Sequence, residues 1–546
     1  MVAKIESPRQ TPAALVKSLF LFNRLSLLIV KGAQKNDSAR AFALMGILLS
    51  LVGCSSAPRV GGEAVLDPGA PVSESCEAIR AFLGNEAIRL TDLRVLKDQM
   101  ERLFTESEKD QAPCPEKRRL EKLRKQVDSR LPSNPQWAVD HAATLKLENA
   151  LIEKNDGFKW RLPGEKGPAS RATYFKRLSF VPERNKRQSL YKLFNSSRSR
   201  KWVTWGFKDL IRARKQEALA AGYTHYLEFA LTRNGQHYGK VLKSVELVRE
   251  GLSDQVRNWM KRHSELAGLS SLEPWDFYFV IEKAWGPSWM APLRTAPAKA
   301  PIEYAKSFLH GVGLDLMSVA GTSDAAGLTF RLDSPVVRSD FGAVVGNLAV
   351  ETYLNEVKQS IPLFQRPSES SREAIHQTFQ WLALQSPSLP LFVSTVVAPS
   401  LGTEVQAAPL GLSPLALEAY RHASRFTFES RWYEDPEVDP FELWTSVNRE
   451  FFGIEITPFY GGFDEESFLK NPGVSGEKVL GNLVAAGLVD SILQNGGPSA
   501  DLGQRFKKEW FSVGSEAATL ELLNRFSAKD WSLNMLQEKL SNALKE

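Results

Sequence analysis

The sequence lacks the short motifs that assign many chains to a function at first sight. Its 546 residues contain no Walker loop, no dinucleotide-binding glycine fingerprint and no serine set between glycines in a nucleophile elbow. No internal repeat or low-complexity tract occurs either. With 43% hydrophobic and 24% charged residues, the chain has the composition of a globular protein. Its length predicts two lobes, or a large body with a smaller helical attachment.

Outside its first residues the chain also lacks a surplus of charge of either sign. The formal net charge is +6. Residues 1–53 contain seven Lys or Arg and two acidic residues, so residues 54–546 carry a net charge of only +1. A nucleic-acid-binding surface needs a concentration of basic side chains. We therefore expect no nucleic-acid partner.

The most apolar run of the leader is too short to span a bilayer. This run, "AFALMGILLSLVG" at residues 41–53, is uncharged and follows several basic residues. A basic region, a short apolar core and small residues before a cleavage site are typical of a secretory signal. We predict a signal peptide over residues 1–53, whose unusual length suggests an over-long start.

The end of this signal resembles a bacterial lipobox, Leu-Val-Gly-Cys, in which the cysteine, here Cys54, is lipidated and becomes the new N-terminus. Residues 54–75 would then form a polar tether. Ser55 resembles the sorting signal for an outer membrane. The predicted location is the bacterial cell envelope, with a lipid anchor in the outer membrane and the body facing the periplasm. A plain signal peptide or a buried helix is the alternative.

Only two cysteines follow Cys54, namely Cys76 and Cys114. Export makes a disulfide permissible, and an even pair fits one. Apolar residues between them recur at helical spacing, and a second, charged helix is predicted after Pro115. We predict a helical hairpin region at 76–155 with a disulfide between Cys76 and Cys114; buried free thiols are the alternative.

The remaining body, residues 170–546, is predicted to be mainly α-helical. Helices are expected at 207–219, 241–266, 303–311, 371–385, 414–429, 440–452, 477–494 and 514–525. Two runs rich in β-branched residues, 327–337 and 343–354, predict a small β-sheet.

One of these helices carries an altered zinc-peptidase motif in "AIHQTFQ", residues 374–380. In H-E-x-x-H, two histidines one turn apart offer imidazoles to a zinc ion and the glutamate acts as general base. Here His376 is present, Gln377 replaces the glutamate and Gln380 replaces the second histidine. Glu404 follows His376 by 28 residues, a suitable position for the third ligand.

With these residues the chain resembles the zinc oligopeptidases, which include oligoendopeptidase F, thimet oligopeptidase and angiotensin-converting enzyme. Three further segments, 202–235, 269–279 and 471–493, resemble segments of these enzymes in the same order. The resemblance covers roughly residues 170–530. It implies a two-lobed helical fold with a deep cleft and one small β-sheet, and a peptide or protein ligand in that cleft.

The departures from the family pattern predict a fold that has lost its chemistry. Gln377 is neutral and cannot serve as the general base. Gln380 is a poor zinc ligand, so His376, Gln380 and Glu404 are interpreted as vestigial metal positions. The late helix has no tyrosine in "GEKVL", at residues 476–480, where active relatives carry them. We expect no catalytic residue and no cofactor.

Two other functions stay open at this point. The first is an active zinc oligopeptidase with an altered metal site, in which His422 substitutes as a ligand. The second is an envelope scaffold that uses its hairpin as the contact surface. If zinc is absent, we expect a neutral network of His376, Gln377 or Gln380 to bind the carboxylate of Glu404.

Overall fold

The computed structural model divides the chain into two compact units, residues 1–71 and 72–546. All described residues belong to the second unit. Several predicted features lie outside the described residues, namely the signal peptide, the tether, Cys54, Cys76, Cys114 and Glu404. Apart from a few positions inside these ranges, the structure describes 77–82, 93–108, 117–128, 134–156, 171–284, 296–314, 336–356, 367–397, 411–453, 465–513 and 518–545.

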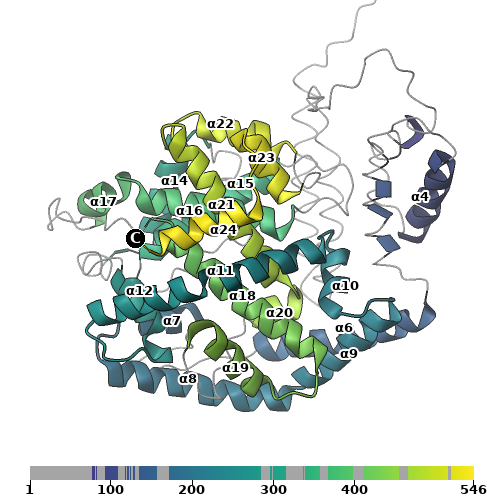
Figure 1. Cartoon of the computed structure of the whole chain (residues 1–546), viewed down its shortest axis with the longest axis horizontal. Coiled ribbons are helices and arrows are strands. Elements are labelled where there is room, and N and C mark those ends of the chain that lie inside the picture. Colours follow the sequence, from purple (N-terminus) through teal and green to yellow (C-terminus); the bar gives the residue numbers. More distant parts are fainter. Residues whose placement is uncertain are drawn as a thin grey trace, which may run out of the picture. The chain divides into compact units, whose positions relative to one another are not determined.

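Every regular element in the described part of the chain is helical (Figure 1). The first group is α4 (Leu93–Glu108), α6 (Pro135–Asp156), α7 (Arg171–Phe180), α8 (Arg184–Trp205), α9 (Phe207–Ala220), α10 (Tyr226–Arg233), α11 (Tyr238–Leu266), η2 (Pro274–Asp276), α12 (Phe277–Ala284) and α14 (Ala300–Gly311). The second group is α15 (Arg338–Glu356), α16 (Glu369–Gln385), α17 (Ser388–Phe392), η5 (Val393–Val397), α18 (Ser413–Glu434), α19 (Pro440–Phe452), α20 (Glu465–Lys470), α21 (Val474–Gln494), α22 (Leu502–Phe506), η7 (Lys507–Phe511), α23 (Thr519–Ser527) and α24 (Leu533–Ala543).

The prediction of a mainly α-helical body is confirmed, and several predicted helices have nearly the observed bounds. The helix expected at 440–452 is α19, and the one expected at 207–219 is α9. The helix expected at 477–494 begins three residues earlier, as α21, directly after Gly473, which adopts the left-handed conformation (φ 80°) that a residue with a side chain rarely takes.

The prediction of a strand at 343–354 was wrong, because this run lies inside α15. Most of α15 is buried, so its side chains are apolar on nearly every side. A short buried helix and a buried strand therefore give the same pattern. The other expected strand, 327–337, lies outside the described residues except for Val336, which is buried.

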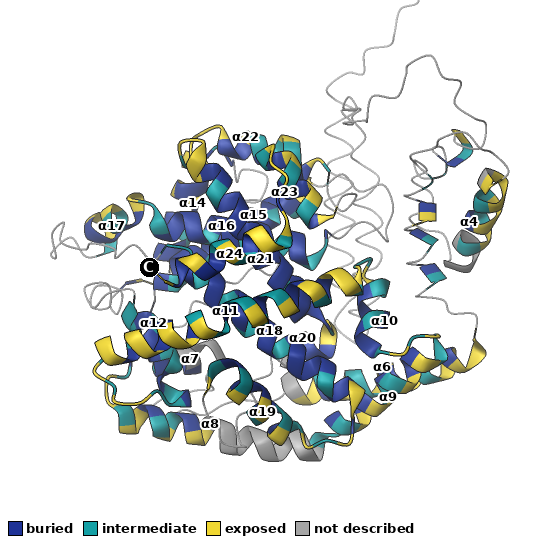
Figure 2. Ribbon diagram, in the orientation of Figure 1, coloured by how far each residue is buried: buried dark blue, intermediate teal, exposed yellow. Residues whose placement is uncertain are grey.

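Helix α16, which carries the altered motif, lies between α15 and α21 in the middle of the large core (Figures 1 and 2). Glycines allow the close approach on both sides. A Cβ on Gly346 of α15 would lie 2.6 Å from the backbone oxygen of His376. On the other side, a Cβ on Gly481 of α21 would lie 2.7 Å from the backbone oxygen of Ser370. The backbone of α16 is thus in close contact with both α15 and α21.

A smaller apolar cluster, separate from the large core, forms near the N-terminal end of the described chain. It is built from α4 and from helical residues in the segments 77–82 and 117–128. Met100 of α4 packs with Leu120, Leu123 and Val127. Helix α6, in contrast, contributes to the large core.

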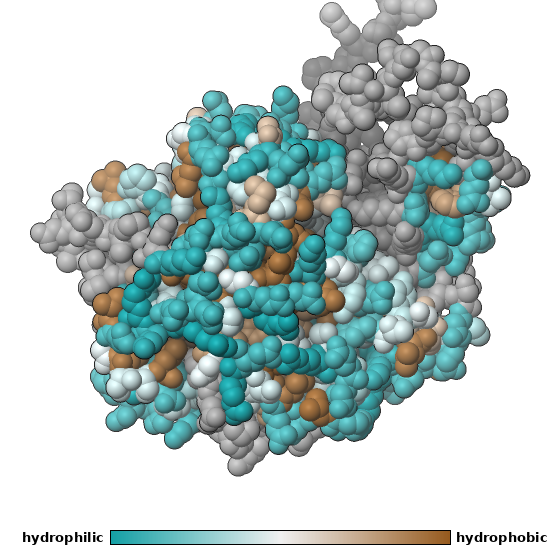
Figure 3. Space-filling model, viewed as in Figure 1, coloured by the Kyte–Doolittle hydropathy of each residue, from teal (hydrophilic) through white to brown (hydrophobic). Residues whose placement is uncertain are grey.

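The visible surface of the described residues is mostly hydrophilic, with apolar side chains in scattered patches (Figure 3). Within the described ranges, we find no helix with the length and apolar character needed to cross a membrane.

Candidate functional site

The N-terminus of α16 is capped both by its own chain and by α21. The hydroxyl of Ser368 accepts a hydrogen bond from the N–H of Ser371 at 3.1 Å. The Glu477 carboxyl accepts from the N–H of Glu369 at 3.0 Å. Burial, with help from the Glu369 carboxylate, raises the pKa of Glu477 to about 8. The Glu477 carboxyl therefore carries a proton at neutral pH, and one of its oxygens still accepts a hydrogen bond from the N-terminus of α16.

The C-terminal end of α16 is held by two side chains from neighbouring helices. The hydroxyl of Tyr304 donates to the carbonyl of Ala383 at 2.8 Å, and Arg338 donates to the carbonyl of Leu384 at 2.7 Å. With both ends and both faces fixed, the motif side chains sit on a rigid backbone.

His376 is half-buried and faces α15. A Cβ on Gly346 would lie 2.7 Å from its Nδ1. Burial lowers the pKa of His376; the Glu373 carboxylate and a hydrogen bond with Gln380 oppose this effect, while Lys478 adds to it. The net result is a neutral imidazole at pH 7. His376 and Gln380, which we interpreted as vestigial ligand positions, thus interact with each other.

Gln377, at the position of the general base, is buried and uses its amide within the helix. Its Nε2 donates to Oε1 of Glu373, one turn earlier, at 2.7 Å. An amide in this position donates a hydrogen bond where a catalytic glutamate would accept a proton. We predicted that His376, Gln377 or Gln380 binds the carboxylate of Glu404. In the described structure, the partner of Gln377 is Glu373.

Glu373 is the centre of the polar group around α16, and our sequence analysis missed it. It is 6% exposed and also receives the Nδ2 of Asn482, from α21, at 3.5 Å. The ammonium of Lys478, one turn earlier on α21, lies 3.6 Å from its Oε2. Burial alone would raise the pKa of Glu373, but Lys478, His376 and Gln377 together lower it. Glu373 is therefore an ionised carboxylate whose counterion is a lysine.

His422, our candidate for a replacement ligand, lies on α18 and is 6% exposed. Its Nε2 is 3.9 Å from Glu418, and its Nδ1 has no hydrogen-bond partner within the described structure. Burial lowers the pKa of His422 well below its usual value, and the cations Lys478, Arg425 and Arg421 lower it further. His422 is neutral in a surrounding that is rich in positive charge.

The described donor set does not fit a catalytic zinc ion. Such an ion needs three protein ligands, and α16 offers one imidazole with two amides. Among the residues that the structure describes, no three His, Cys, Asp or Glu side chains are grouped as metal ligands. Lys478 also places a positive charge beside the motif, which repels a second cation.

Several solved structures have a fold similar to that of this chain. PZ peptidase A, determined with an inhibitor, matches with a TM-score of 0.64 and 13% identity over 86% of each chain. An oligoendopeptidase F structure matches with a TM-score of 0.62 and 12% identity over 86% of this chain and 83% of that one. Another, from Bacillus anthracis, matches with a TM-score of 0.61 and 12% identity over 86% and 85%.

The chain has an oligopeptidase fold. No family model matches its sequence, and no curated protein matches it either. The chain is therefore similar to these proteins in structure, and sequence identities of 12–13% are too low to detect the similarity from sequence comparison.

Another segment of this oligopeptidase fold, 202–235, holds a buried charged network. Arg214 of α9 is fully buried and bonds Glu148 of α6 at 2.7 Å, as well as the hydroxyl of Tyr433. Glu217, three residues later, is also buried and contacts His141 at 2.7 Å. Here the charged side chains hold helices together and do not face a site.

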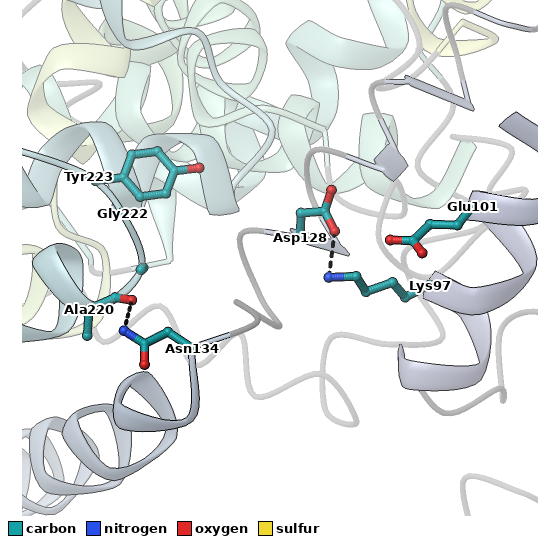
Figure 4. Close-up of a pocket in the computed structure, with 8 residues that line it drawn as sticks. Lys97, Glu101, Asp128, Asn134, Ala220, Gly222 and Tyr223 are labelled. Carbon is teal, nitrogen blue, oxygen red and sulfur yellow. Dashed lines mark hydrogen bonds and ion pairs between the residues drawn. The ribbon is translucent and has the colours of Figure 1, made fainter. Parts of the chain in front are cut away.

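An open pocket of about 480 Å³ lies in a different part of the oligopeptidase fold, and α16 contributes nothing to its lining (Figure 4). Lys97 and Asp128 form an ion pair at 3.0 Å on one side of it. Asn134 donates to the carbonyl of Ala220 at 2.9 Å on the other. Its lining has no buried reactive group, so we assign it no chemistry.

Proposed function

We propose that this chain is a non-catalytic relative of the oligopeptidases that binds a peptide, or an extended protein segment, in the cleft where active enzymes cleave one. The observation that carries the proposal is the hydrogen bond from Gln377 to Glu373. In this bond Gln377, which stands where the motif has its general base, is a donor to its own helix, and this supports the proposal. Loss of a general base alone typically reduces a rate by about 10²–10⁴-fold.

The proposal also includes the place where the chain works. The signal-like leader and the lipobox-like Leu-Val-Gly-Cys ending at Cys54 support an exported lipoprotein, anchored in the outer membrane with its body in the periplasm. Peptides in that compartment are the expected ligands. Cys76 and Cys114 would meet an oxidising environment there, in which a disulfide persists.

Metal analysis of the purified full chain tests the loss of catalysis. We expect no stoichiometric zinc and no cleavage of short peptides. The double variant Gln377→Glu with Gln380→His restores the H-E-x-x-H pattern on α16. It tests whether this helix can still bind a metal, and we expect measurable zinc binding. The single variant Gln385→His, which adds a histidine at the end of the same helix, is the control and should bind none.

Two results would overturn the proposal in different ways. Stoichiometric zinc, with peptide cleavage that is lost on Glu404→Ala, would make the chain an active oligopeptidase with an altered metal site. Failure of a random library of short peptides to bind the full chain would remove the peptide-binding part and favour the envelope scaffold. Calorimetric titration, or protection from hydrogen exchange, gives the readout.

A further inference from the structure

We propose that the open pocket between α4 and the C-terminal end of α9 binds a small ligand through one positively charged amine group. The lining has no reactive side chain, so the inference concerns binding alone. The volume of about 480 Å³ lies within the range of about 300–1,000 Å³ that is typical of ligand sites. Because α16 contributes nothing to the lining, this site is separate from the proposed peptide-binding cleft.

The carboxylate of Glu101 is available to a ligand in this pocket. Glu101 lies on α4 and is exposed, and its carboxylate points into the pocket (Figure 4). Among the residues that the structure describes, none donates a hydrogen bond to this carboxylate or forms an ion pair with it. The other carboxylate of the lining, Asp128, is bound by Lys97 at 3.0 Å and contacts Arg124 at 3.7 Å. An incoming cation therefore finds its charge partner in Glu101.

Tyr223, on the other side of the pocket, also favours a positive charge. Its ring lies in the lining and packs against Phe229, with ring centres 5.4 Å apart (Figure 4). Burial raises the pKa of Tyr223; a hydrogen bond with Thr232 opposes this effect, while the carboxylates of Glu228 and Asp128 add to it. The phenol is therefore neutral and stands in a negative potential. A cation near the face of such a ring is attracted by its π electrons.

The end of a helix forms a third part of the lining. Ala220 ends α9, and Ala221 and Gly222 follow it along the pocket. The carbonyl of Ala220 accepts a hydrogen bond from Asn134 at 2.9 Å, which holds this end in place. The C-terminus of a helix carries a partial negative charge and stabilises nearby cations. A carboxylate, an aromatic ring and a helix C-terminus thus line one cavity, and each favours a positively charged ligand.

An organic amine fits this lining better than a metal ion does. Calcium takes about six to eight oxygen ligands. Across the described ranges, no three His, Cys, Asp or Glu side chains are grouped as metal ligands. An ammonium group has only three N–H donors, which one carboxylate and bridging water can satisfy. The ring of Tyr223 can also contact the alkyl part of an amine, which a metal ion lacks.

Three small molecules of similar size test the charge preference of the full chain. They are n-butylamine, which is positive at neutral pH, n-butanol, which is neutral, and butyrate, which is negative. Binding is measured by ligand-observed NMR. We expect n-butylamine to bind at least about tenfold more tightly than the other two. Equal binding of all three would overturn the proposal, and so would displacement of n-butylamine by an equal concentration of calcium chloride.

The amine can come from a free small molecule or from the N-terminus of a short peptide. An uncharged tripeptide amide with a free N-terminus and its N-acetylated form separate these sources. If the peptide end is the source, the free form should bind at least about tenfold more tightly than both n-butylamine and the acetylated form. If a small amine is the source, the free peptide should bind no more tightly than n-butylamine. Only binding that Glu101→Gln weakens counts, because binding in the peptide cleft does not depend on Glu101.

Variants assign the preference to the lining. Glu101→Gln keeps the shape but removes the charge, so n-butylamine should bind at least about fivefold more weakly. Glu106→Gln is the matched control, since Glu106 is exposed on the same helix and does not line the pocket. Equal effects of these two variants would overturn the assignment to the pocket.

The aromatic wall is tested by two substitutions of Tyr223. Tyr223→Phe keeps the ring and should retain binding of n-butylamine, whereas Tyr223→Leu should weaken it about two- to fivefold. Melting curves check that both variants are folded. Equal binding by the two variants would remove the ring from the site. Loss of the amine preference leaves the proposed peptide-binding function intact, because that function depends on α16.

Discussion

Two regions of the molecule differ in how their buried charged residues are partnered. In α9 and its neighbours, Arg214 and Glu217 are buried and each is bonded to partners on other helices. In α16 and α21, the buried carboxylate of Glu373 is partnered by the amide of Gln377 and, at longer distance, by the ammonium of Lys478. The first region joins several helices through short ion pairs, whereas the second uses an amide and a more distant lysine.

The difference follows from what depends on each group. Removing one member of a buried ion pair leaves a desolvated charge behind, which destabilises a fold by about 3–5 kcal/mol. The amide of Gln377 is neutral, so its bond to Glu373 involves no second buried charge. We therefore expect substitutions in α16 to have smaller effects on stability than substitutions in the α9 network.

The largest expected effect comes from breaking the α9 network. Arg214→Met leaves the Glu148 carboxylate without its guanidinium partner and frees the carbonyls of Phe468 and Leu469. We expect a loss of about 3–5 kcal/mol in the free energy of unfolding, measured by urea denaturation.

The control for this prediction is Arg212→Met on the same helix, whose ion pair with Glu437 is exposed. It should leave stability near the parent value. Equal effects of the two substitutions would contradict the structural role of the buried network.

The next effect is a dependence of stability on pH that comes from two buried carboxyls. Burial raises the pKa of Glu429 and of Glu477 to about 8. Each caps a helix, Glu429 through the N–H of Gly473 and Glu477 through that of Glu369. Because the folded pKa exceeds the unfolded one, the folded chain binds more protons, and stability falls as pH rises from about 4.5 to about 8.

Glu429→Gln and Glu477→Gln should remove this loss while keeping a hydrogen-bond acceptor. Relative to the parent, each variant should gain on the order of 1–3 kcal/mol between pH 5 and pH 8, measured by denaturation at both values. The exposed residue Glu246 on α11 provides the control through Glu246→Gln. A variant that follows the parent's pH profile would show that its carboxyl is ionised when folded.

A smaller effect is expected from the close contact between α15 and α16. Gly346→Ala places a methyl group 2.6 Å from the backbone of His376, so the helices must separate. We expect a loss of about 1–3 kcal/mol in thermal or chemical unfolding. Gly311→Ala on α14, where no atom lies within 4 Å, should be neutral or slightly stabilising. Stabilisation by Gly346→Ala would refute the tight packing.

The smallest expected effect concerns the former general-base position. Gln377→Glu removes the amide donor to Glu373 and sets two carboxyls against each other. At pH 8 we expect a loss of about 1–2 kcal/mol, which shrinks near pH 5 as one carboxyl takes a proton. The isosteric change Gln380→Glu, at a half-buried position, serves for comparison. An effect that is the same at both pH values would argue against like-charge repulsion.

The helical class and several helix bounds could be predicted from the sequence because they follow from local signals. The α19 bounds, for example, follow from Asp439 as N-cap, proline at the first position and Gly453 after the end. The sequence could not show whether residues 343–354 form a helix or a strand. Burial on nearly every side removes the periodicity that distinguishes the two.

The site was predicted only in part. The motif located His376, Gln377 and Gln380 on one helix, which the structure confirms. It gave no warning of Glu373 or Lys478, because their pairing depends on how α21 packs against α16, a contact between residues about 100 positions apart. The only hint in the sequence was that Glu373 and Lys478 carry opposite charges on two helices predicted to be buried.

The glycine contacts on the two faces of α16 also have a mechanical consequence. With Gly346 and Gly481 pressed against its backbone, α16 can neither rotate about its axis nor slide by a turn without a collision. Helices α15, α16 and α21 should therefore behave as one rigid block. Their central amides should be among the slowest in the chain to exchange with solvent.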